Sequence, residues 1–156
     1  MENVEKSVEV DVPLRTAYNQ WTQFEEFPRF MEGVKEVRQL DNKRLHWRAE
    51  VAGEKREWTA EITEQTPDRV VAWRSTSGKP NSGHVSFQPL DGGQRTRVTV
   101  RIGYEPEGVK ENLADAVGAV GRRVKADLDR FKEFIESRGQ ETGAWRGEIH
   151  GEVVKR

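Results

Sequence analysis

The feature that most constrains the fold is a long amphipathic stretch near the C-terminal end, residues 109–135. At about 1.5 Å per residue, a helix of this length reaches roughly 40 Å. So long an apolar stripe needs an equally broad apolar surface against it, and we expect a sheet to supply that surface. The apolar residues recur at steps of three and four, the period of one helix face; they are Leu113, Val117, Val120, Val124, Leu128, Phe131 and Ile135.

Most of the chain before this helix has the pattern of short strands. A strand at 4–12 alternates valine with polar residues. Pro13 then suits the start of a short helix that runs through Trp21, and a second short helix is expected at 25–30. Six more strands, joined by turns that imply an antiparallel meander, are expected at about 34–40, 44–52, 55–65, 69–76, 83–90 and 95–104.

Alternation within these strands assigns one face of the sheet to the helix. Trp47, Trp58 and Trp73 fall on that inward face of three consecutive strands, and Phe87 and Tyr104 share it. Wide flat rings of this kind suit a planar or polyisoprenoid ligand, but they can equally fill the core of a sheet curved around one helix. The opposite face carries charged side chains that can form cross-strand ion pairs.

Composition predicts one domain of ordinary size. The chain has 156 residues, of which 26 are basic and 27 acidic, and the charges are interspersed. An even mixture of both signs offers no patch for a phosphate backbone, so nucleic-acid binding is not expected. We place the domain at 1–138 and expect the polar segment 139–156 to be a flexible tail.

Sequence motifs do not indicate catalysis. The chain has no cysteine, and its three histidines are scattered without metal-binding spacing. The motifs of serine hydrolases, nucleotide-binding loops and dinucleotide-binding turns are also missing. We therefore expect no catalytic residue, no metal and no cofactor. The N-terminal residues lack the pattern of a signal peptide and no segment is long enough for stable membrane insertion, so a cytoplasmic protein is the expectation.

Several stretches resemble one known group of proteins. They are Trp58-Thr-Ala-Glu-Ile62, Val71-Ala-Trp-Arg-Ser-Thr-Ser-Gly78, Gly83-His-Val-Ser-Phe-Gln-Pro-Leu90, and Thr96-Arg-Val-Thr-Val100 leading to Tyr104-Glu-Pro-Glu-Gly108. Together with the order of elements, they resemble the polyketide cyclase/dehydrase branch of the START-like (helix-grip) superfamily, which is related to coenzyme Q-binding START-like proteins. The resemblance covers residues 3–137. It implies an α+β fold in which a seven-stranded antiparallel sheet wraps around the C-terminal helix, with two short helices between strands 1 and 2.

The resemblance also implies an apolar cavity between sheet and helix. Our preferred hypothesis is a non-catalytic carrier or sensor of a small hydrophobic molecule, such as a lipid, a quinone or a polyketide-like aromatic. The alternatives are a cyclase or dehydrase acting on a polyketide-like substrate, and a protein-interaction module that uses the tail. No feature of the sequence fixes an oligomeric state. The residues predicted to line the cavity are Phe27, Met31, Trp47, Trp58, Trp73, Phe87, Tyr104, Leu113, Val117, Val120 and Val124.

Overall fold

A computed structural model of the chain describes residues 2–51, 53–105 and 113–156. Strands dominate it, and helices connect or cover them. In chain order the elements are β1 (Glu2–Val10), α1 (Leu14–Trp21), the 3-10 helix η1 (Phe24–Arg29), β2 (Val34–Gln39), β3 (Arg44–Val51), β4 (Glu54–Thr66), β5 (Val70–Ser75), β6 (Asn81–Leu90), the 3-10 turn η2 (Asp91–Gly93), β7 (Arg95–Tyr104), α2 (Leu113–Arg138), β8 (Glu148–His150) and β9 (Val153–Lys155).

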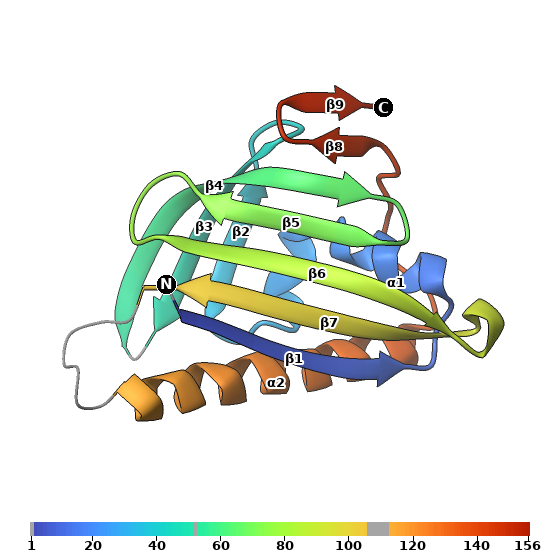
Figure 1. The fold of residues 1–156 in the computed structure, drawn as a ribbon, viewed down its shortest axis with the longest axis horizontal. Coiled ribbons are helices and arrows are strands. Elements are labelled where there is room, and N and C mark those ends of the chain that lie inside the picture. Colours follow the sequence, from blue (N-terminus) through green and yellow to red (C-terminus); the bar gives the residue numbers. More distant parts are fainter. Residues whose placement is uncertain (1, 52, 106–112) are drawn as a thin grey trace.

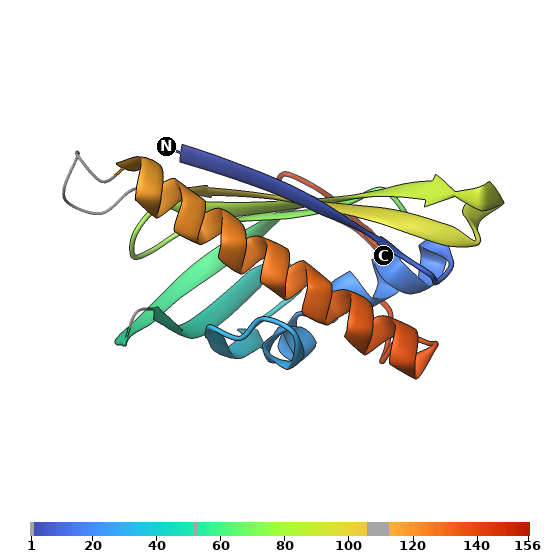
Figure 2. The same ribbon diagram turned by 90° about the horizontal axis from the view of Figure 1, so that it is seen from below.

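The principal sheet of the described residues runs in the order β1-β7-β6-β5-β4-β3-β2. The strands from β2 to β7 form an antiparallel meander, and β1 pairs with β7 along its whole length, from Glu2 opposite Tyr104 to Val10 opposite Thr96. The sheet is strongly curved, and α2 lies across its concave side (Figures 1 and 2). This arrangement confirms the predicted α+β helix-grip fold.

The two short helical elements carry a dense set of aromatic residues. Pro13 is the N-cap of α1, with an extended ψ of 153°. Pro28 lies inside η1, where the short 3-10 helix tolerates the missing N–H. Both elements stand at one end of the concave face (Figure 1). Together with the residue that follows η1, they supply aromatic side chains that are at most 2% exposed, namely Tyr18, Trp21, Phe24, Phe27 and Phe30.

The long helix buries its C-terminal half more deeply than its N-terminal half. Val124, Leu128, Phe131 and Ile135 are buried, whereas Val117 and Val120 are half-buried. The predicted apolar face of the helix is therefore correct for the residues of α2 whose side chains the structure describes. The expected helical residues 109–112 and the side chain of Leu113 lie outside the described residues.

The C-terminal segment was expected to be a flexible tail, and the structure instead gives it regular structure. After α2 the chain crosses α1, and its last part forms β8 and β9 at the edge of β4 (Figure 1). Ile149 in β8 is fully buried and lies opposite Gln65 of β4. Strands of three residues are too short to show an alternating pattern, so β8 and β9 could not be predicted from periodicity.

The convex face of the sheet is polar. Cross-strand contacts on it include the ion pair of Arg97 with Glu9 at 3.0 Å and the hydrogen bond between His46 and Glu57 at 3.0 Å. Such exposed pairs contribute little stability, so the fold depends on the concave face. Among the helices of the described residues, none is long and apolar enough to cross a membrane.

Candidate functional site

Three indole rings form a column on the concave face of the sheet. Trp47 of β3 and Trp58 of β4 are opposite each other in register, and their rings stack with centroids 5.7 Å apart and planes 8° apart. Trp47 also stacks with Trp73 of β5, at 5.7 Å and 29°. The far edge of Trp73 lies over Gly83 of β6, where an ideal Cβ would be 2.3 Å from the ring. Only glycine leaves room for the ring in this position.

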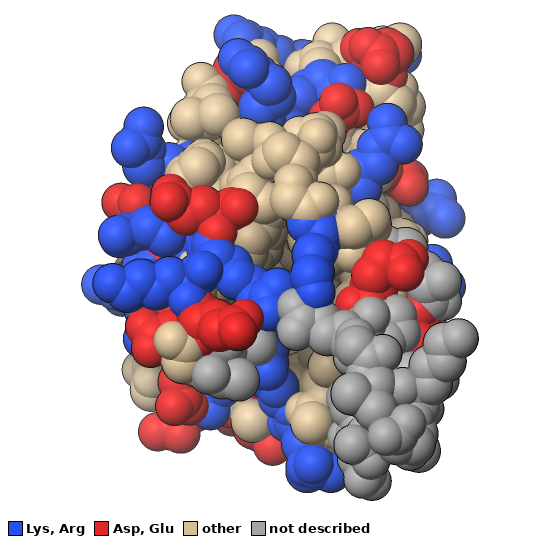
Figure 3. Space-filling model, turned by 90° about the vertical axis from the view of Figure 1, so that its left-hand side faces the viewer, with Lys and Arg blue, Asp and Glu red and all other residues tan. Residues whose placement is uncertain are grey.

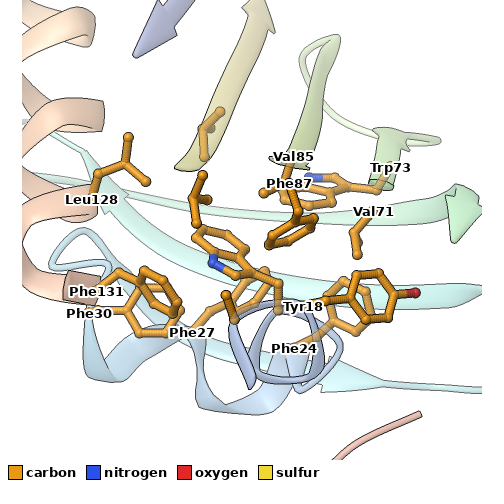
Figure 4. Close-up of a cluster of buried hydrophobic side chains, with 14 of the residues drawn as sticks. Tyr18, Phe24, Phe27, Phe30, Val71, Trp73, Val85, Phe87, Leu128 and Phe131 are labelled. Atoms are coloured by element: carbon orange, nitrogen blue, oxygen red, sulfur yellow. The ribbon is translucent and has the colours of Figure 1, made fainter. Parts of the chain in front are cut away.

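One end of the concave face is filled with packed side chains (Figure 4). Phe27 of η1 contacts both Trp47 and Trp73, with ring centroids 5.8 and 5.9 Å apart. Phe131 of α2 packs against Trp21 at 5.2 Å and Phe30 at 5.1 Å. These contacts have the edge-to-face and tilted geometry of an ordinary aromatic core. This end, which lies under the C-terminal half of α2, is closed.

The other end lies under the N-terminal half of α2, and among the described residues it is less densely filled. Its apolar side chains are half-buried and pack against the edge of the core; we call Trp58, Ile102, Tyr104, Val117 and Val120 the open-end set. Figure 3 shows this end of the molecule, where uncharged side chains gather in the middle and charged side chains surround them.

Two surface grooves run along the flanks of α2. The larger, about 640 Å³, lies between β1 and α2 and is lined by residues that include Val4, Lys6, Val117 and Gly121. The smaller, about 390 Å³, lies on the other flank, between α2 and the residues after η1, and is lined in part by Gly33. Both grooves reach Ala126 of α2. The middle of α2 thus has a groove on each side.

Several buried polar atoms have no hydrogen-bond partner among the described residues; Oη of Tyr18 and Nε1 of Trp21 are on α1, and three others are on the inward face of the strands. These three are Nε1 of Trp47, Nε1 of Trp58 and Oη of Tyr104. A buried donor without a partner destabilises the folded state by about 1–3 kcal/mol. Burial also raises the pKa of Tyr104, and a tyrosine phenol carries its proton at neutral pH even without this shift. All three groups can therefore donate a hydrogen bond to an acceptor placed between the sheet and α2.

Polar side chains at strand ends form a rim beside Trp58. The Ser75 hydroxyl accepts a hydrogen bond of 3.0 Å from the backbone N–H of Asn81, and Arg56 donates to Glu54 at 3.1 Å. Thr96 of β7 is not part of this rim. It is fully buried, and its hydroxyl donates a hydrogen bond of 3.0 Å to the backbone carbonyl of Val12. Among the described residues, no group of three or more His, Asp or Glu side chains is placed to hold a metal ion.

The predicted cavity residues divide into two groups. Leu113 begins α2, and its side chain lies outside those described. The buried group fills the packed core and consists of Phe27, Trp47, Trp73, Phe87 and Val124. The half-buried group packs against the edge of that core and consists of Met31, Trp58, Tyr104, Val117 and Val120.

Sequence reasoning missed two residues of the site. Ile102 was not among the predicted cavity residues, although it belongs to the open-end set. Gly83, which makes room for Trp73, was also overlooked. A glycine inside a strand often marks a close approach by another group, so its position among inward residues was an available signal.

A comparison with protein families agrees with this geometry. Residues 10–133 match the sequence model of the family described as polyketide cyclase / dehydrase and lipid transport. The chain belongs to this family. The predicted START-like, polyketide cyclase/dehydrase branch is thereby confirmed.

Individual relatives extend the likeness over nearly the whole chain. An uncharacterized 17.2 kDa protein of Streptomyces lincolnensis, from the melC2-rnhH intergenic region, is 49% identical over 150 residues, which is 96% of this chain and 99% of the relative. The crystal structure of DR_A0006 from Deinococcus radiodurans is 30% identical, with a TM-score of 0.71 over 88% of this chain and 99% of its own. The Zhui aromatase/cyclase of Streptomyces sp. R1128 is 20% identical, with a TM-score of 0.73 over 92% and 99%, and this likeness concerns the fold alone.

Proposed function

We propose that the protein binds a small hydrophobic molecule carrying hydrogen-bond acceptors, of the quinone or polyketide-like aromatic kind, between its sheet and the N-terminal half of α2. The observation that carries this proposal is the set of unpaired donors on an otherwise apolar face, Trp47 Nε1, Trp58 Nε1 and Tyr104 Oη. A site of apolar walls with a few well-placed polar groups is the usual form of a small-molecule pocket.

The positions of the donors suggest the size of the ligand. Trp58 is on β4 and Tyr104 on β7, with β5 and β6 between them. Three strand spacings correspond to about 14 Å along the sheet, and to less across its concave side. A planar body of two or three fused rings with oxygen atoms at both ends fits such a span. Its flat face would stack on Trp58, the outermost ring of the indole column.

The same donors predict selectivity. An unpaired buried donor is satisfied when a ligand carbonyl accepts from it, whereas a hydrocarbon of the same shape leaves it unpaired. Each hydrogen bond gained in this way is worth about tenfold in affinity, since about 1.4 kcal/mol corresponds to a factor of ten. We therefore expect ketones and quinones to bind in preference to the parent hydrocarbons.

The test is a titration of the full chain with 1,4-naphthoquinone and with naphthalene, followed by native mass spectrometry and tryptophan fluorescence. The chain has no cysteine, so the quinone cannot add to a thiol. Trp58→Phe and Tyr104→Phe are each expected to weaken naphthoquinone binding by about tenfold. Leu40→Ala is the control, because Leu40 is exposed, follows β2 and belongs to neither the open-end set nor the C-terminal segment. Equal affinity for the two compounds, or binding of neither, would contradict the proposal.

A second candidate function is a cyclase or dehydrase that acts on a polyketide-like substrate. The observation that favours it is Tyr104, whose phenol oxygen is buried and has no hydrogen-bond partner among the described residues. Such a phenol could donate a proton or a hydrogen bond to a ketone oxygen during ring closure or loss of water. Incubation with a poly-β-ketone thioester, analysed by liquid chromatography and mass spectrometry, tests this candidate. Turnover that Tyr104→Phe abolishes supports it, and a bound but unchanged substrate counts against it.

A further inference from the structure

The C-terminal segment buries polar side chains of α1 that a free helix would expose to solvent. Asn19, Gln20 and Thr22 lie at the end of α1, and they are only 2%, 0% and 3% exposed. Polar residues of this kind are normally found on the surface. Their burial therefore needs partners, and residues 141–146 supply them.

Hydrogen bonds tie each of these side chains to the segment. The Asn19 amide donates to the Glu141 carboxylate at 2.7 Å and accepts from Arg146 at 2.7 Å. The Gln20 amide donates to the Thr142 hydroxyl and accepts from the Thr142 backbone N–H, both at 3.0 Å. The backbone N–H of Trp145 donates to the Thr22 hydroxyl at 3.1 Å.

Two further contacts hold the segment in place beyond α1. Arg146 forms an ion pair of 2.8 Å with Asp68, and its guanidinium lies over the Tyr18 ring, 5.5 Å from the centroid. Ile149 then enters the hydrophobic core and joins β8 to the end of β4. The segment thus bridges from the end of α2, across α1, to the main sheet (Figure 1).

The helix held in this way carries part of the aromatic filling of the closed end. Trp21, between Gln20 and Thr22 in sequence, packs against Phe27 at 5.2 Å and Phe30 at 5.3 Å. Since Phe27 in turn contacts Trp47, a movement of α1 and η1 would be transmitted to the indole column. The position of α1 therefore decides how much of the concave face is filled.

We propose that residues 140–150 act as a latch on α1 and η1. When the latch is docked, it holds the aromatic side chains of these elements against the sheet, and when it undocks, they can move outward and enlarge the space under α2. The contacts of the latch are mostly polar, with Ile149 as its one fully buried apolar anchor among the described residues, so it can open without unfolding of the sheet. The consequence for ligand entry rests on the proposed function, whereas the coupling of latch and α1 does not.

Hydrogen–deuterium exchange of the ligand-free full chain tests the coupling. Arg146→Ala removes the contacts to Asn19, Asp68 and Tyr18, and Ile149→Ser removes the apolar anchor. Peptides within residues 14–30 are expected to exchange at least about tenfold faster in both variants, while peptides of β7 keep their protection. The matched control is Glu152→Ala, because Glu152 is exposed and has no side-chain hydrogen bond or ion pair among the described residues. Unchanged exchange in residues 14–30, or an equal rise in β7, would overturn the latch.

The association rate of 1,4-naphthoquinone, measured by stopped-flow fluorescence, tests the link to ligand entry. Faster association in Arg146→Ala than in the unmodified chain is the expected result. Equal rates, in a variant whose residues 14–30 exchange faster, would refute the link to ligand entry and leave the mechanical coupling established. If no naphthoquinone binds at all, the proposed function fails while the exchange experiment still decides the latch.

Discussion

Substitution of Gly83 by alanine tests the packing of the indole column. An ideal Cβ at this position lies 2.3 Å from Cζ2 and 2.4 Å from Cε2 of Trp73. Carbon atoms in contact are normally about 3.5–4.0 Å apart, so the ring or the strand must move by more than about 1 Å. Trp47 and Phe27, with centroids 5.7 and 5.9 Å from that of Trp73, restrict the movement of the ring.

The expected change in the free energy of unfolding follows from two opposed effects. Overpacking of a core costs about 1–3 kcal/mol. Alanine is favoured over glycine within a strand by about 0.5–1 kcal/mol. We therefore expect Gly83→Ala to lower the free energy of unfolding by about 1–2 kcal/mol. With a urea m-value of about 2 kcal/mol per molar, the midpoint falls by about 0.5–1 M.

Urea denaturation followed by circular dichroism measures this change, and a double-mutant cycle tests its cause. In a Trp73→Leu background the ring is gone, so Gly83→Ala should be neutral or stabilising. Gly33→Ala is the control, because its Cβ would be at an ordinary 3.4 Å from the Glu50 carbonyl. The same loss of stability with and without Trp73 would refute the reasoning, as would no loss in the native background.

Two further predictions concern the helix and the buried tyrosine. In chemical denaturation, Phe131→Ala, in the closed end, should lower the free energy of unfolding by about 3–5 kcal/mol, whereas Val120→Ala, in the open end, should lower it by less than about 1.5 kcal/mol. Similar losses for the two variants would contradict the division of the concave face into a closed and an open end. Burial raises the pKa of Tyr18 to about 12, from 10.0. Above about pH 10 Tyr18 ionises in the unfolded chain but stays protonated in the folded protein. The free energy of unfolding therefore keeps its full value with respect to this group below about pH 10 and falls as the pH rises towards about 12. Tyr18→Phe should therefore show a smaller fall in stability between about pH 9 and about pH 11, and an identical fall in both proteins would exclude this origin.

The sheet, α1 and α2 could be predicted because their patterns are long and regular. The alternation around Trp47 and Trp73 gave the correct face, and the stripe through Leu128 and Ile135 gave the helix. The turn residues fixed most strand boundaries to within two positions. Periodicity is a local property of the sequence. It therefore predicts a helix of several turns or a strand of several alternating residues reliably.

The sequence could not distinguish the filled end from the open end. Trp47 and Trp58 occupy equivalent positions on neighbouring strands, but only Trp47 is buried, because Phe27 reaches it from η1. The docked C-terminal segment was missed for a related reason. Its partners Asn19 and Gln20 are more than a hundred residues away in sequence, and no local pattern reports such a contact.

The central claim, that a ligand binds at the open end through the indole donors, is tested most directly by nuclear magnetic resonance of the indole N–H groups. The five tryptophans give five such signals in a protein labelled with nitrogen-15. On addition of 1,4-naphthoquinone, the signals of Trp47 and Trp58 should shift in a saturable way, while those of Trp21 and Trp145 stay in place. Saturable shifts confined to Trp145, or no shift at any indole, would contradict the account.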